Sequence, residues 1–146
     1  MLKRFHLFWV GLFLFLFIVP SSHSCKCMAL DVSAQFQKAA LVFTGKIVKI
    51  TETGKIDKMF SEKEVLVEFV VDKQWKGEHQ EKITLKTVQN ASSCAGYNFK
   101  NDMAYLVFAD KNEDNSYDTS LCSGTKFISD AAEDIKNLDS IEIINE

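Results

Sequence analysis

The sequence predicts a mainly β domain: a small closed or partly open barrel of five strands, with one helix near each end and two disulfides. Apolar and polar residues alternate along residues 64–75 and again along 82–87, which is the period of a strand with one buried face. Short polar segments separate five such strands, and closing them into a ring removes unpaired sheet edges. The chain also contains four cysteines, an even number that suits a disulfide framework.

Residues 1–24 predict a secretory signal peptide, which leaves residues 25–146 as one domain of ordinary size. Two basic residues precede an unbroken apolar run, Leu7–Val19, and small residues follow it. The run is shorter than the roughly 20 apolar residues that a transmembrane helix needs. We therefore expect cleavage after Ser24 and a secreted, extracellular product with no transmembrane segment.

The expected mature chain is acidic. The whole chain has 17 basic and 20 acidic residues, and Lys3 and Arg4 are lost with the signal. The remaining domain thus carries 15 basic residues against 20 acidic ones. This excess of negative charge argues against nucleic acid or an anionic membrane surface as the partner. We expect a monomer.

All four cysteines, Cys25, Cys27, Cys94 and Cys122, lie outside the signal and predict two disulfides. Three pairings are possible, of which the direct bridge between Cys25 and Cys27 is sterically poor. A long-range bridge would close a loop of about 70 residues or more and contribute roughly 4 kcal/mol in the chain-entropy model. A structural zinc site with four cysteine ligands is the alternative. It is disfavoured because Cys94 and Cys122 do not form a second closely spaced pair.

The N-terminal half of the domain is expected to hold a helix and three strands. Residues 28–40 have apolar side chains at near-helical spacing, and Asp31 or Ser33 can cap the helix start. Residues 41–51 predict a strand in which Gly45 suits a bulge or a barrel corner. The segments that follow are a polar loop over 53–63 and the strands over 64–75 and 82–87, with a turn at 76–78 between them.

The C-terminal half is expected to hold two strands and a helix. The segments are a loop over 90–100, an apolar strand over 103–109, an acidic turn over 110–116 and a strand over 117–122. Ser129 is expected to cap a helix over 130–138, because the acidic residues of its first turn are favourable near the positive end of the helix dipole. Ile141, Ile143 and Ile144 then form a short terminal segment.

Two motifs have weaker functional interpretations. His79 is the single histidine of the mature chain and lies in a charged turn, which disfavours a Ser–His–Asp or Cys–His catalytic system. Residues 110–115 place oxygen side chains at the first, third and fifth positions of a calcium loop, but the sixth is Asn115 and the twelfth is Leu121. A hairpin turn is the preferred interpretation of that segment. We expect neither enzyme activity nor a cofactor of the chain's own.

The strongest functional pattern is Cys25-Lys26-Cys27 at the expected new N-terminus. An α-amine has a pKa near ~8, so a zinc ion can displace its proton. The amine and the carbonyl of Cys25 could together chelate one metal in a five-membered ring. A disulfide from Cys25 would hold that chelate on the barrel and lower the entropy cost of binding. The alternative is that the two cysteines are only structural staples.

Several short segments together resemble the N-terminal inhibitory domain of the tissue inhibitors of metalloproteinases and, more loosely, the wider netrin-like module. Their order and spacing cover nearly all of residues 25–146. They are Cys25-Lys26-Cys27, Phe36, Leu41–Lys46, Trp75-Lys76-Gly77, Cys94 with Gly96-Tyr97, Tyr105–Phe108 and Thr119–Cys122.

The resemblance implies an OB-type barrel with the disulfides Cys25–Cys94 and Cys27–Cys122. It also implies a partner, a secreted zinc metalloprotease, whose catalytic zinc would be bound by the amine and carbonyl of Cys25. The zinc belongs to that enzyme, and its binding would displace the water used as nucleophile. The implied protease contacts are Cys25, Lys26, Cys27 and Met28 along the cleft, with Ala91, Ser92 and Ser93 beside it. Lys26 would enter the pocket for the residue after the scissile bond.

The chain departs from the family at four points. Lys26 stands where a small residue or Thr is usual, and an ammonium group in an apolar pocket costs several kcal/mol unless it is paired. Gln37 stands at the first position of a third disulfide of this domain, and Ala95 is an extra residue in the flanking loop. The second, cysteine-rich domain of the animal inhibitors is also missing.

Two further functions fit the sequence. One is a netrin-like extracellular binding module without inhibitory activity. The other is a surface lipoprotein acylated at Cys25, which is disfavoured because the Leu of a lipobox is missing three positions upstream.

Overall fold

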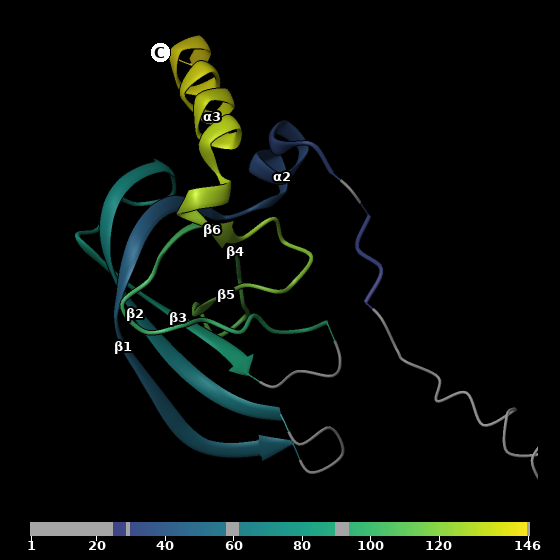
Figure 1. Cartoon of the computed structure of the whole chain (residues 1–146), viewed down its shortest axis with the longest axis vertical. Coiled ribbons are helices and arrows are strands. Elements are labelled where there is room, and N and C mark those ends of the chain that lie inside the picture. Colours follow the sequence, from purple (N-terminus) through teal and green to yellow (C-terminus); the bar gives the residue numbers. More distant parts are fainter. Residues whose placement is uncertain (1–24, 29, 58–61, 90–93, 146) are drawn as a thin grey trace, which may run out of the picture.

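The computed structural model describes residues 25–145 except for residue 29, residues 58–61 and residues 90–93 (Figure 1). In chain order the elements are α2 (Val32–Lys38), β1 (Leu41–Asp57), β2 (Glu62–Lys76), β3 (Lys82–Gln89), β4 (Ala104–Lys111), β5 (Tyr117–Asp118), β6 (Lys126–Phe127), the 3-10 helix η1 (Ile128–Asp130) and α3 (Ala132–Asn145). Within this described part, no helix is long and apolar enough to cross a membrane.

Five strands form the predicted barrel. β1 pairs with β2, β2 with β3, and β3 with β5; β5 then pairs with β4, and β4 returns to β1. Among the strand pairings of the described residues, that of β3 with β5 alone is parallel. The ring is uneven because β5 has two residues while β1 has 17. This closed order confirms the predicted OB-type class, and β6 adds a short strand to the side of β4.

β1 can close the ring because it bends at irregular positions. Its register with β2 shifts between Thr44 and Gly45, which confirms the bulge predicted there. A Cβ atom at Gly45 would lie 2.8 Å from the carbonyl oxygen of Val70. Glycine therefore lets β1 pass close to β2 while its other edge pairs with β4.

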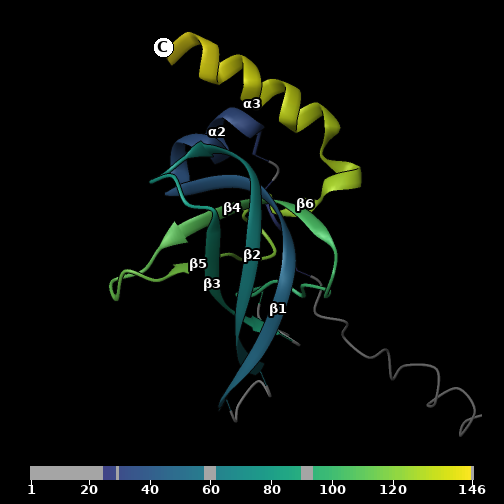
Figure 2. The ribbon, with the colours of Figure 1, turned by 90° about the vertical axis from the view of Figure 1, so that its left-hand side faces the viewer.

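Two apolar clusters stabilise the domain. The first fills the barrel, where the rings of Phe69, Phe99 and Tyr105 meet edge to face with centroids 4.9–5.3 Å apart. The second lies between the outside of the barrel and the two helices, which cover one end of it in Figure 2. Leu138 of α3 and Val42 of β1 are fully buried there.

The Trp75-Lys76 pair at the end of β2 holds both helices. The indole nitrogen of Trp75 donates to a carboxylate oxygen of Asp139 in α3 at 2.7 Å. Lys76 donates to the carbonyl oxygens of Phe36 and Gln37 at the end of α2, at 2.7 and 3.0 Å. A cation at a helix C-terminus is favourable because the carbonyls there carry partial negative charge.

Two predicted boundaries in the N-terminal half were wrong. α2 is shorter than expected and begins at Val32; its cap is Asp31, which accepts from the backbone N–H of Ala34 at 2.7 Å. The polar loop expected over 53–63 is instead strand up to residue 57 and again from residue 62. Residues 53–56 of this hairpin are all exposed, so no buried face imposes an alternation of polar and apolar residues.

The C-terminal predictions also need correction. The strand expected over 117–122 ends at Asp118, and β6 was not predicted. Ser129 does not cap the last helix, because it lies in η1 and its hydroxyl donates to Asp130. α3 continues to Asn145 and so includes the expected terminal segment.

Candidate functional site

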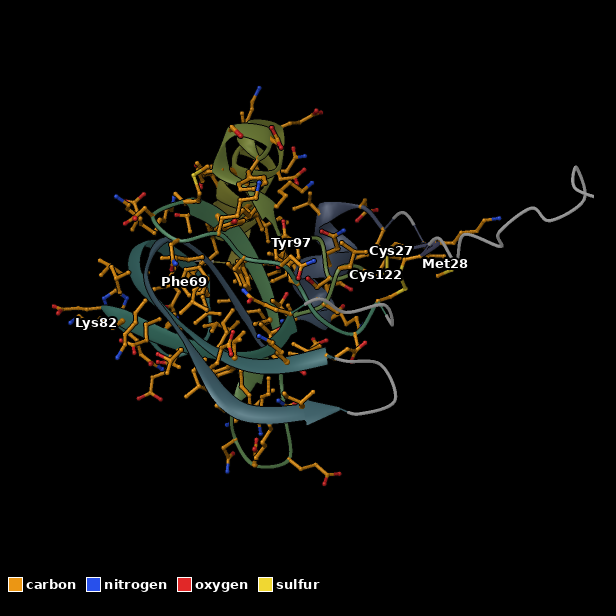
Figure 3. The ribbon with its side chains drawn as sticks, turned by 60° about the horizontal axis from the view of Figure 1, so that its bottom comes forward. Cys27, Met28, Phe69, Lys82, Tyr97 and Cys122 are labelled. Atoms are coloured by element: carbon orange, nitrogen blue, oxygen red, sulfur yellow. A yellow bond between two sulfur atoms is a disulfide. The ribbon has the colours of Figure 1, made fainter. Side chains whose placement is uncertain are left out.

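Two disulfides fix the N-terminal segment of the domain to the barrel. Cys25 is bonded to Cys94 and Cys27 to Cys122, with Cα atoms 5.8 and 5.1 Å apart. These are the pairings that the resemblance implied. A zinc site with four cysteine ligands is wrong because every one of these sulfurs is in a disulfide. Figure 3 shows Cys27, Cys122 and Met28 together on one side of the barrel, with Lys82 on the opposite side.

The segment between and after these cysteines is exposed. Cys25 is partly buried, whereas Lys26, Cys27 and Met28 are exposed and belong to no helix or strand. Met28 keeps 80% of its surface, and Leu121, next to the bonded Cys122, keeps 49%. Residues 25–28 thus present exposed backbone together with the side chains of Lys26 and Met28, and we call this segment the ridge. Ala91, Ser92 and Ser93, the other predicted contacts, lie outside the described residues.

The first anchor of the ridge is the loop that carries Cys94. A Cβ atom at Gly96 would overlap the carbonyl oxygen of Val88, so the loop lies directly on β3. Tyr97 follows and packs on Phe99 with ring centroids 4.7 Å apart. Burial of this side chain raises the pKa of Tyr97 to about 12. The anchor is therefore tied to the aromatic core of the barrel.

The second anchor is the loop that carries Cys122, and hydroxyl groups hold it to β4. Thr119 donates to the carbonyl oxygen of Phe108 at 2.8 Å, and the N–H of Phe108 donates to Thr125 at 3.1 Å. The hydroxyls of Thr119 and Thr125 lie 2.8 Å apart, and Ser123 lies 2.7 Å from Thr119. Thr119 and Thr125 are both buried. The backbone groups of Phe108 thus bond to the hydroxyls of Thr119 and Thr125, and these buried hydrogen bonds order the loop.

No metal-binding group of at least three histidine, cysteine or acidic side chains occurs in the described ranges. His79 is exposed in the turn between β2 and β3. The chemical groups that the anchored segment presents are instead the backbone of Cys25 and the side chains of Lys26 and Met28. Backbone nitrogen and oxygen held at a fixed position are suited to binding another molecule's metal or peptide groups.

The acidic segment 110–116 is the turn of the β4–β5 hairpin, as preferred from the sequence. One carboxylate oxygen of Asp114 accepts from the N–H and the hydroxyl of Ser116, at 3.0 and 2.5 Å. The other accepts from Lys86 at 3.3 Å. The hydrogen bonds from Ser116, followed by Lys86, lower the pKa of Asp114 to about 2. Its oxygens are thus engaged by protein groups.

Replacing Asp118 by Asn is expected to raise the melting temperature at neutral pH by a few degrees. Burial, followed by the charge of Asp110, raises the pKa of Asp118 in the folded chain. A raised carboxyl pKa means that the folded state binds the proton more tightly than the unfolded state. Wild-type stability therefore falls as pH rises through the two pKa values, and the penalty stays above them. The gain from D118N should vanish below about pH 3.5, which thermal unfolding across pH would test.

Comparison with known proteins does not assign the chain. No protein-family model matches it, and no curated protein matches it in sequence. The interpretation of the candidate site therefore depends on the geometry of its own residues. Sequence reasoning found the four cysteines but missed the buried hydroxyls that hold their loops. The available signal was that the inward positions of β3 read Ile83, Leu85 and then Thr87, with a hydroxyl where a third apolar residue would be expected.

Proposed function

We propose that the mature chain is a secreted inhibitor of zinc metalloproteases, in which the free α-amine and the carbonyl of Cys25 chelate the catalytic zinc of the target. This occupies the coordination position from which the enzyme's water would attack. Lys26 then enters the pocket that follows the scissile bond, and Cys27 and Met28 lie along the cleft. Ala91, Ser92 and Ser93 form the other flank.

The observation that carries this proposal is the pair of disulfides at both ends of a three-residue segment. Cys25 and Cys27 are each bonded to a different loop, and Lys26 between them is exposed. Each bridge stabilises the barrel, and the short spacing of Cys25 and Cys27 adds a further effect. Two bridges at this spacing fix the direction of the intervening backbone, which lowers the entropy lost when it enters a cleft.

Carbamylation of the mature protein near pH 7 tests the chelation. The α-amine has a pKa near ~8 and lysine amines one near ~10.4, so cyanate modifies the N-terminus first. We expect the unmodified protein to inhibit at least one enzyme of a zinc protease panel and the carbamylated protein to inhibit none. Inhibition that survives carbamylation excludes chelation. If the unmodified protein inhibits no enzyme of the panel, the netrin-like binding module is favoured, for which a blocked amine leaves partner binding unchanged.

Mass spectrometry of the N-terminal peptide of the exported protein should precede that assay. The proposal requires Cys25 to be the first residue and to carry no added mass. A peptide that begins upstream of Cys25 removes the free amine, and an acyl chain on Cys25 would indicate the lipoprotein instead.

Replacing Lys26 by Thr is expected to change which proteases are inhibited. An unpaired ammonium group is costly in an apolar pocket and favourable in an acidic one. K26T should therefore strengthen inhibition of enzymes with an apolar pocket after the scissile bond by about tenfold or more. It should weaken inhibition of enzymes with an acidic pocket. Inhibition constants over one panel measure both, and an unchanged ranking of the enzymes would place Lys26 outside the pocket.

A further inference from the structure

One buried hydroxyl joins the two loops that carry the disulfides. The hydroxyl of Thr87 in β3 donates to the carbonyl oxygen of Thr119 at 3.0 Å. The hydroxyl oxygen of Thr87 in turn accepts from the backbone N–H of Tyr97 at 3.3 Å. Thr119 begins the loop with Cys122, and Tyr97 lies three residues after Cys94. Thr87 is only 5% exposed, so water does not readily replace these bonds.

We infer that Thr87 is a positioning residue, whose hydroxyl fixes the two anchor loops relative to each other and thereby orients the backbone of Cys25 and Lys26. This inference rests on the proposed function for its effect on inhibition. Each loop also has contacts of its own: Gly96 lies on β3, and Thr119 bonds to β4. Among the hydrogen bonds described above, those of Thr87 are the ones that reach both loops.

The position of Thr87 explains why β3 can supply this link. β3 begins at Lys82, on the side of the barrel opposite Cys27 and Cys122 (Figure 3), and ends at Gln89, so Thr87 lies near the far end of the strand from Lys82. Ile83 and Leu85 fill the barrel, and Thr87 is the next inward-facing residue. A hydroxyl has one donor and two acceptor sites, so Thr87 can serve a carbonyl and an N–H at once.

The expected effect follows from the fraction of molecules in which the ridge has the binding orientation. An apparent dissociation constant rises in inverse proportion to that fraction. If loss of the hydroxyl lets the two anchor loops move independently, the oriented fraction falls, and we expect inhibition to weaken by about tenfold. The disulfides and the barrel core stay as they are.

Three variants test this role. Thr87→Val removes the hydroxyl and keeps the shape, and Thr87→Ser keeps the hydroxyl. Thr44→Val is the matched control, because Thr44 is 4% exposed and its hydroxyl bonds only to Lys73 of β2 among the contacts described, at 3.5 Å. Inhibition is measured well below the melting temperature of every variant. T87V should lose about tenfold, whereas T87S and T44V should stay near the wild type. Wild-type inhibition by T87V, or an equal loss in T44V, overturns the inference.

A second readout separates this inference from the proposed function. The NMR order parameter of the Lys26 amide reports the rigidity of the ridge without any protease. It should fall in T87V and not in T44V, even if the wild-type chain inhibits no enzyme of the panel. An unchanged value in T87V overturns the positioning role. Should T87V not fold, amide exchange at Tyr97 in the wild-type chain decides: protection near the global limit supports the link, and rapid exchange contradicts it.

Discussion

A chain with one extra alanine ahead of Cys25 is expected to lose about a hundredfold or more in inhibition of any zinc protease that the mature chain inhibits. The extra residue converts the α-amine of Cys25 into a peptide nitrogen. The lone pair of that nitrogen is delocalised into the neighbouring carbonyl and is no longer available as a metal ligand. Inhibition constants of the extended and unextended chains measure the loss.

The matched control carries the alanine after Glu146 instead. It should inhibit like the unextended chain, and both extended chains should keep the wild-type melting temperature, since neither residue enters the barrel. Equal inhibition by the chain extended at Cys25 would show that the amine does not contact the metal. The ridge would then act, if at all, through Lys26 and Met28 alone.

Removing the Cys27–Cys122 disulfide is the second change with a large expected effect. The bridge joins residues 95 positions apart, and in the chain-entropy model a loop of about that length contributes roughly 4–5 kcal/mol. We expect the double variant C27S/C122S to lose about 4 kcal/mol in the free energy of unfolding. Denaturant titration measures it, and a loss below about 1 kcal/mol would mean that the unfolded chain is already compact.

The matched comparison is C25S/C94S, which removes the bridge between residues 69 positions apart. Because loop entropy grows only with the logarithm of length, the two variants should lose nearly the same stability. Both should also lose inhibition, since each frees one end of the ridge. Retained inhibition in C25S/C94S would show that the backbone at position 25 is oriented without the bridge to position 94.

The barrel could be predicted where strands bury one face. β2 and β3 show clean alternation because Val65, Val67 and Leu85 point into the core. The end of β1 beyond residue 51 could not be predicted, since residues 51–56 are all exposed and no buried face imposes an alternation. β5 and β6 have two residues each, too few for any period to appear. The last helix was predicted to end at Leu138, although no glycine or proline there marks an end, and α3 continues to Asn145.

The sequence was sufficient to choose the cysteines of the candidate site, but not to find the contacts that hold their loops. Chelation by a free α-amine at Cys25 stays a prediction from the sequence, which requires Cys25 to be the first residue of the exported chain. The disulfide partners came only from the resemblance, because four cysteines allow three pairings. The role of Thr87 depends on two loops that lie 10 and 32 residues away along the chain. A threonine in a strand is common, and only tertiary structure shows which groups its hydroxyl joins.

The long span of both bridges has a consequence for biosynthesis. Ribosomes make the chain from its N-terminus, so Cys25 and Cys27 emerge well before Cys94 and Cys122. During that interval the two early thiols can react only with each other or with small thiols and oxidoreductases. The Cys25–Cys94 bridge therefore cannot close before β3 has been made, and the Cys27–Cys122 bridge cannot close before β5 has been made. A thiol-exchange catalyst that undoes premature bonds at Cys25 and Cys27 is therefore expected to speed oxidative folding.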